Sequence, residues 1–90
     1  MQRTKLLISG KVQGVYYRQS MLNFTSNFPI TGYVCNLPTG QVLAEIQGNA
    51  ADIQQILTWC HSGPEMANVT SLEKEDMELV DSEKVFEIRR

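Results

Sequence analysis

The chain has 90 residues and a formal net charge of −2, with 42% hydrophobic and 20% charged residues, an ordinary composition for one soluble globular domain. The acidic balance argues against a nucleic-acid partner, because such proteins usually carry an excess of basic surface residues. No apolar run approaches membrane-spanning length and the N-terminus has no signal cleavage site, so we expect a cytoplasmic protein with no membrane partner.

The first predicted elements are a strand and a helix, joined by a loop that contains two glycines. Residues 4–10 are typical of a central strand, because three apolar residues stand in succession within them. From about Tyr17 to Phe28, apolar residues recur at intervals of three to four positions, which predicts a helix with one face on a core. This helix should end before Pro29, because the residue preceding a proline disfavours helix.

Two further strands form a predicted hairpin. Residues 30–36 are rich in β-branched and aromatic side chains, and residues 41–47 alternate between apolar and polar side chains. The intervening Leu37-Pro38-Thr39-Gly40 is a typical turn, because proline fixes φ and glycine can take a positive φ. We expect this hairpin to bury one face.

The remaining elements are a second helix and two strands. Asn49 is a good N-cap for the helix, which should end at Gly63-Pro64. Residues 69–76 predict a weaker, peripheral strand, and residues 85–89 predict a closing strand. We interpret the acidic connection between them, Met77 to Glu83, as a solvated loop.

This order of elements predicts an α+β fold. The expected architecture is a ferredoxin-like two-layer sandwich, with an antiparallel β-sheet of about five strands and two α-helices on one face. We expect residues 1–90 to form this single domain, because no linker or low-complexity segment interrupts them.

The loop from Gly10 to Arg18 has the features of an anion-binding site. Glycines at positions 10 and 14 free the backbone and let a ligand approach the main chain. Such a loop can direct several N–H groups inward, and the following helix adds its positive dipole end. Arg18 supplies a planar fork suited to two oxygens of one phosphate. The pattern therefore indicates phosphoryl binding, with a plain connecting loop as the alternative.

Asn36 is a second candidate residue, at the end of the strand that leads into the predicted turn. A short amide at this position would ordinarily cap the turn. Both a turn role and a site role stay open from this residue alone.

The whole chain resembles the acylphosphatase family. The family's first signature is matched completely, and the second matches through Asn36 and three following positions at the expected intervals. The matching residues are Gly10, Val12, Gln13, Gly14, Val15, Tyr17 and Arg18 for the first signature, and Gly32-Tyr33-Val34-Cys35-Asn36, Gly40, Val42 and Gly48 for the second. The segments Trp59 to Pro64 and Phe86 to Arg89 also resemble the family.

The resemblance implies an enzyme that hydrolyses the carboxyl–phosphate bond of small acyl phosphates to a carboxylate and inorganic phosphate. It implies that the loop Gln13, Gly14, Val15, Tyr16, Tyr17 and Arg18 holds the phosphoryl group through its main-chain N–H groups and the Arg18 guanidinium. Asn36 would orient the attacking water, since an amide cannot act as a general base near neutral pH. The carboxylate is already a good leaving group, so the expectation is no cofactor and no metal.

Cys35 departs from the family pattern, which usually has a basic or other polar residue there. As a strand neighbour of Asn36 it should point to the opposite face, so the chemistry should survive, although an exposed thiol would make the protein sensitive to oxidation. Two cysteines without a secretion signal are typical of free thiols, and a bridge between Cys35 and Cys60 stays open. His61, the single histidine, is interpreted as an exposed helix-end residue.

Two other functions compete with this hypothesis. One is a non-catalytic module that binds phosphate or carbamoyl phosphate within a larger protein, which the end of the chain at Arg90 disfavours. The other is an RNA-binding domain, which the apolar central strands disfavour. We expect a monomer that binds phosphate or sulfate as product-like ligands, and nothing in the loop indicates what recognises the acyl portion.

Overall fold

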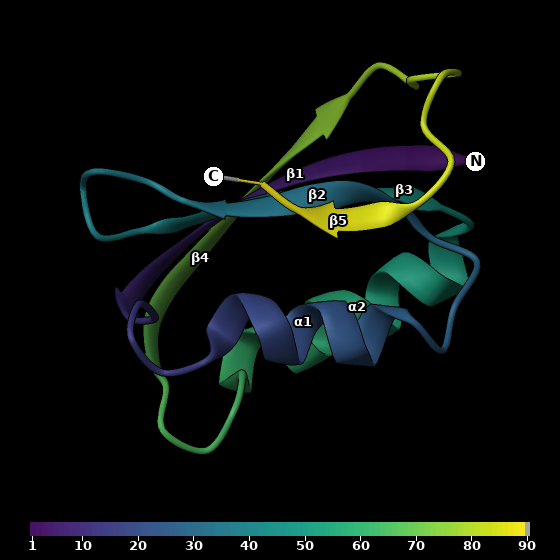
Figure 1. The fold of residues 1–90 in the computed structure, drawn as a ribbon. Coiled ribbons are helices and arrows are strands. Elements are labelled where there is room, and N and C mark those ends of the chain that lie inside the picture. Colours follow the sequence, from purple (N-terminus) through teal and green to yellow (C-terminus); the bar gives the residue numbers. More distant parts are fainter. Residues whose placement is uncertain (90) are drawn as a thin grey trace.

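The computed structural model describes residues 1–89. The elements follow in the order β1 (Gln2–Lys11), α1 (Tyr17–Thr25), β2 (Thr31–Asn36), β3 (Val42–Gly48), α2 (Ala50–Ser62), β4 (Asn68–Met77) and β5 (Phe86–Ile88). The strands form one five-stranded sheet in the order β4-β1-β3-β2-β5, and both helices cover the same face of it (Figure 1). The predicted two-layer α+β sandwich is confirmed.

The strand pairing is mostly antiparallel, as expected, with one exception. β1 pairs antiparallel with β3 and with β4, and β2 pairs antiparallel with β3, whereas β2 and β5 are parallel. The exception arises because β4 and β5 lie at opposite edges of the sheet, so the connection between them crosses the sheet instead of forming a hairpin. In this register Ile88 lies level with Val34, close to the end of β2.

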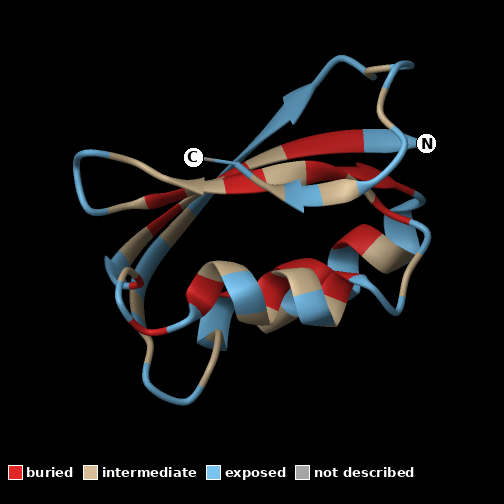
Figure 2. Ribbon diagram, in the orientation of Figure 1, coloured by how far each residue is buried: buried red, intermediate tan, exposed pale blue. Residues whose placement is uncertain are grey.

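The hydrophobic core fills the space between the sheet and the two helices, where buried positions of both layers face each other (Figure 2). The alternation predicted for β3 is confirmed, because its three alternating apolar side chains are fully buried. Fully burying one large apolar side chain contributes roughly 1.5–3 kcal/mol, so this layer dominates the stability. The fully buried strand residues include Leu6 and Ile8 from β1, Val34 from β2, and Val42, Ala44 and Ile46 from β3.

Both ends of α2 follow the local signals in the sequence, whereas the C-terminal end of α1 does not. The N-cap of α2 is as predicted, because Asn49 Oδ1 accepts a hydrogen bond of 2.9 Å from the N–H of Asp52, and the helix is followed by Gly63 at φ 64°. α1 ends at Thr25, earlier than predicted. The chain tightens there, with the Phe28 N–H donating to the Thr25 carbonyl at 3.0 Å, so Phe28 packs on the core from a turn.

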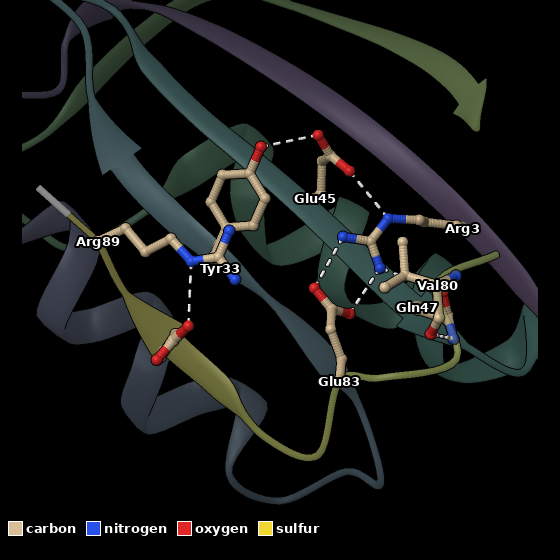
Figure 3. Close-up of polar contacts among 8 residues, drawn as sticks. Arg3, Tyr33, Glu45, Gln47, Val80, Glu83 and Arg89 are labelled. Carbon is tan, nitrogen blue, oxygen red and sulfur yellow. Dashed lines mark hydrogen bonds and ion pairs between the residues drawn. The ribbon is translucent and has the colours of Figure 1, made fainter. Parts of the chain in front are cut away.

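The acidic connection before β5 is exposed at most positions, as predicted for a solvated loop, but Val80 and Glu83 are partly buried. Glu83 accepts two hydrogen bonds, of 2.6 and 2.9 Å, from the guanidinium of Arg3, a β1 residue that is only 4% exposed. The main chain of Val80 exchanges two further bonds with the side chain of Gln47. The connection is therefore attached to the sheet face that the helices leave uncovered (Figure 3).

We call this group the Arg3 cluster; it comprises Arg3, Tyr33, Glu45, Gln47, Val80 and Glu83. The Arg3 Nε donates to one oxygen of Glu45 at 2.8 Å, and the Tyr33 hydroxyl donates to the other at 2.7 Å (Figure 3). Burial alone would raise the pKa of Glu45, but the hydrogen bonds from Tyr33 and Arg3 outweigh it and hold that pKa below its usual range. The hydrogen bonds from Arg3 likewise lower the pKa of Glu83, against the opposing effect of burial.

Candidate active site

The loop between β1 and α1 is shaped by two residues with left-handed backbone conformation. Gly14 has φ 74° and Tyr16, the N-cap residue of α1, has φ 63°. Glycine adopts this conformation without strain, whereas for a bulky residue such as tyrosine it is a rare and strained state. A Cβ added to Gly14 would meet no protein atom within 4 Å, so the space beside this glycine is open.

Gly10 has a different role from the one that the sequence suggested. A Cβ at this position would lie 2.2 Å from the main-chain oxygen of Asn68, so the glycine allows β4 to approach β1. The sequence predicts that both glycines let a ligand approach the loop. Of the two, only Gly14 has open space beside it in the structure.

Several main-chain N–H groups of this loop donate to no main-chain acceptor in the part of the chain that the structure describes. The first backbone hydrogen bond at the start of α1 runs from the N–H of Ser20 to the carbonyl of Tyr16, at 2.9 Å. Within residues 1–89, no backbone hydrogen bond is donated by the residues from Gly14 to Arg18. These donors stand at the positive end of the helix dipole, an arrangement that binds anions in many proteins.

A cavity of about 520 Å³ lies against this loop. It is lined by Val12, Gln13, Gly14, Tyr16, Tyr17, Arg18, Gln19, Asn36 and Ile88. The structure thus brings Asn36 together with the predicted loop residues, except for Val15, which is 4% exposed and packs in the core. Sequence reasoning missed Val12 and Gln19, which flank the predicted segment, and Ile88, whose place depends on the parallel pairing of β5 with β2.

Arg18 and Asn36 both keep unused hydrogen-bonding capacity in this cavity. Within the described residues, Arg18 has no ion-pair partner. The Oδ1 atom of Asn36 is buried and has no hydrogen-bond partner, and it is the only such side-chain atom in residues 1–89. Since buried polar atoms are almost always paired, this amide fits a role toward a bound molecule.

The turn after Asn36 is held by other groups. The Leu37 N–H donates to the Gln41 carbonyl at 2.8 Å. The side-chain amide of Gln13 donates to the carbonyls of Leu37 and Gln41, at 2.9 Å each. Gln13 therefore ties the loop to the hairpin and fixes the loop's position relative to Asn36.

Tyr17 attaches the start of α1 to the end of α2. Its hydroxyl donates to the carbonyl of Cys60 at 2.6 Å, and its ring lies 5.5 Å from that of Trp59. Burial raises the pKa of the Tyr17 phenol and raises that of the Cys60 thiol to about 12, so neither ionises near neutral pH. The two thiols are free, with Cys60 buried and Cys35 partly buried, as predicted for a chain without a secretion signal.

Two further findings concern residues 1–89 as a whole. Neither α1 nor α2 combines the length and the apolar character that a membrane-spanning helix needs. No group of three or more His, Cys, Asp or Glu side chains gathers in this part of the chain in a way that could hold a metal ion.

Comparison with known proteins gives consistent similarities. Residues 4–88 match the family model described as Acylphosphatase. A protein named acylphosphatase from Methylococcus capsulatus is 38% identical over 90 residues, which covers 100% of this chain and 98% of the relative.

Solved structures show the same similarity. The structure of an acylphosphatase from Coxiella burnetii superposes with a TM-score of 0.91 at 31% identity, covering 98% of this chain and 92% of that one. An acylphosphatase from Bacillus subtilis superposes with a TM-score of 0.95 at 21% identity over 100% of both chains, which shows a shared fold.

Proposed function

The chain belongs to the acylphosphatase family and is an enzyme with that activity, and from this premise we propose a mechanism and a site. The reaction is hydrolysis of the carboxyl–phosphate bond of a small acyl phosphate. The cavity beside Arg18 and Asn36 is its site, and since one chain supplies all the groups, a monomer is sufficient for activity. One observation carries this proposal: residues that line one cavity supply loop N–H groups, a guanidinium and an amide oxygen that have no partner within residues 1–89.

The phosphoryl group binds to the loop formed by residues 13–18. Main-chain N–H groups at the positive end of α1 contact its oxygens, and the Arg18 guanidinium binds two of them through its planar fork. These donors are fixed before the substrate arrives, because Gln13 and Tyr17 hold the loop at both of its ends. Preorganised donors of this kind stabilise the charge on the transferring group without reorganising during the reaction. Inorganic phosphate and sulfate occupy the same place as product-like ligands.

Asn36 orients the attacking water. An amide can hold a water molecule in place through its oxygen or its NH₂ group, but it cannot remove a proton near neutral pH. Its contribution is therefore positional and electrostatic. The buried, unpartnered Oδ1 supports this role, since no hydrogen bond within the described protein uses it.

The chemical step needs no strong base and no metal ion. The oxygen of water forms a bond to phosphorus while the bond from phosphorus to the acyl oxygen breaks, with the electron pair leaving on the carboxylate. The second product is inorganic phosphate, released as H₂PO₄⁻: one hydrogen of the water stays on the attacking oxygen, and the other passes to another phosphate oxygen. Because a carboxylate is a good leaving group, binding and charge stabilisation supply the catalysis expected for a loose phosphoryl transfer.

The test is turnover of an acyl phosphate by the wild type and by Arg18→Lys, each in excess chelator. Removing a preorganised donor costs roughly a hundredfold or more in rate, and lysine cannot replace the two-pronged contact. We expect the wild type to keep its activity in chelator and Arg18→Lys to lose at least that factor. Near-normal turnover by Arg18→Lys would contradict phosphoryl binding by the fork. Binding of phosphate without any turnover in the wild type would support the non-catalytic module instead.

A further inference from the structure

The backbone pairing between β1 and β3 ends before it reaches the candidate site. Its last registered pair is Ile8 with Val42, and the remaining residues of β1 pair only with β4. Asn36 lies level with Val42, at the end of the pairing between β2 and β3. In residues 1–89, no backbone hydrogen bond joins residues 12–16 to the hairpin that carries Asn36. The distance between the phosphoryl-binding loop and the Asn36 amide therefore depends on side-chain contacts.

Gln41 takes part in the contacts that extend this pairing. Its side-chain Nε2 donates to the hydroxyl of Ser9 at 2.9 Å, which ties the turn after Asn36 to β1. Its carbonyl accepts a hydrogen bond from the side chain of Gln13, also at 2.9 Å. Gln41 is thus bonded to one residue before the end of β1 and to one residue after it.

The two contacts hold the turn from different sides. Ser9 and Gln41 are next in sequence to Ile8 and Val42, which are both fully buried. Because neighbouring residues of a strand point to opposite faces, the bond from Gln41 to Ser9 lies on the sheet face that the helices leave uncovered. Gln13, in contrast, lines the cavity. Tilting the turn toward either side breaks one of the two bonds, so the turn keeps one orientation.

The side chain of Gln41 is itself fixed in place. Its Oε1 accepts a hydrogen bond of 2.8 Å from the hydroxyl of Thr39, a residue of the same turn. This bond leaves the Nε2 end of the amide for Ser9. A side chain whose two ends are both bonded loses little further freedom when it transmits the position of β1 to the turn.

We propose that Gln41 is a positioning residue of this enzyme, which through its bond to Ser9 keeps the Asn36 amide at the place where it orients the attacking water. Gln41 does not line the cavity, so it acts through Asn36 and not on the substrate. A misplacement of about 1 Å can cost about a hundredfold in rate, so even a small shift of the amide should be measurable. This inference rests on the proposed function, since it takes Asn36 as the residue that orients the water.

The experiment measures kcat for benzoyl phosphate and the inhibition constant of inorganic phosphate in Gln41→Met and in Ser9→Ala. Each variant removes the same bond from one of its two ends. We expect kcat to fall by about fivefold to tenfold in both, because the amide is no longer held in one place. The inhibition constant should change by less than about twofold, since the groups that bind phosphate belong to the loop. The matched control is Gln55→Met, a substitution of an exposed glutamine of α2, which should keep the wild-type kcat.

The same two substitutions in an Asn36→Ala background separate positioning from a general structural role. With the amide absent, neither Gln41→Met nor Ser9→Ala should lower kcat further, and the two substitutions together should lose no more than either alone in the wild-type background. Ser9→Thr keeps the hydroxyl and should keep the wild-type kcat.

Two results would overturn the inference. One is an unchanged kcat in Gln41→Met and Ser9→Ala, and the other is a fall of the same size with and without the Asn36 amide. The second would mean that the bond supports the fold in general. Full turnover by Asn36→Ala alone would instead contradict the proposed function, whatever the result for Gln41.

Discussion

The two ends of β1 carry polar clusters of opposite character. At the start of the strand, the guanidinium of Arg3 donates to Glu45, Gln47 and both oxygens of Glu83, so four of its five N–H groups are used within the protein (Figure 3). After the end of the strand, Arg18 has no ion-pair partner and Asn36 Oδ1 has no hydrogen-bond partner in residues 1–89. A saturated cluster stabilises the fold, whereas an unsaturated one keeps its bonding capacity for a ligand.

This difference predicts that stability and activity depend on separate residues, near the two ends of β1. Substitutions in the Arg3 cluster should lower the free energy of unfolding and leave the chemistry of the folded molecules intact. Substitutions of Arg18 or Asn36 should lower the turnover and leave the free energy of unfolding almost unchanged. The contrast fails if either kind of substitution changes both quantities to the same extent.

The largest expected effect is the loss of stability in Arg3→Leu. The substitution leaves the carboxylates of Glu45 and Glu83 without their buried partner, and breaking one side of a buried ion pair costs about 3–5 kcal/mol. Urea unfolding at neutral pH measures this change. The comparison is Arg89→Leu, which removes a half-exposed ion pair with Glu87 and the packing of the guanidinium on the ring of Tyr33, and which should cost about 1 kcal/mol. Equal small losses for the two variants would show that the Arg3 cluster does not hold the connection before β5.

The second effect is the loss of turnover in Asn36→Ala. Without the amide the water is no longer positioned, so kcat should fall about a hundredfold, or about 2.7 kcal/mol in the barrier. The unfolding free energy should change by less than about 1 kcal/mol, because no hydrogen bond in the described structure is lost. Inhibition by inorganic phosphate should weaken far less than turnover. A loss of phosphate affinity as large as the loss of turnover would assign Asn36 to the geometry of the turn instead.

The smallest effect concerns pH. The pKa values of Glu45 and Glu83 are lowered in the folded protein, so these carboxylates contribute stability above their unfolded pKa values, near 4.3. That contribution is lost as the pH falls from about 5 through the folded pKa values. The wild type should therefore lose stability in this range more steeply than Glu83→Gln, as measured by urea unfolding at several pH values. Parallel pH profiles would mean that the Arg3–Glu83 pair adds nothing.

The parts of the fold that the sequence could predict are those governed by local signals. The N-cap at Asn49, the stop at Gly63 and the alternation in β3 each depend on residues a few positions apart. The parallel pairing of β5 with β2 could not be predicted in this way, because hydrogen bonds from Arg3 to Glu83, 80 positions away, attach the connection to the sheet. The same long-range arrangement brings Ile88 to the cavity.

The sequence predicts the residues of the candidate site, but it does not predict the contacts that hold these residues in position. The loop and Asn36 were identified from their place beside glycines and a turn and from a family resemblance. The side-chain bonds of Gln13 to the hairpin and the separate role of Gly10 depend on how β-strands far apart in sequence pack together. Periodicity and turn chemistry carry no signal for either.

The most direct test of the contrast is thermal unfolding in increasing inorganic phosphate, with chloride at equal ionic strength as the reference. A ligand that binds only the folded state stabilises it by about 2.7 kcal/mol at a hundred times its Kd. We expect the wild type and Arg3→Leu both to gain stability with phosphate, and Arg18→Ala not to respond. A wild type that does not respond, or an Arg18→Ala variant that gains as much as the wild type, would contradict phosphoryl binding at this loop.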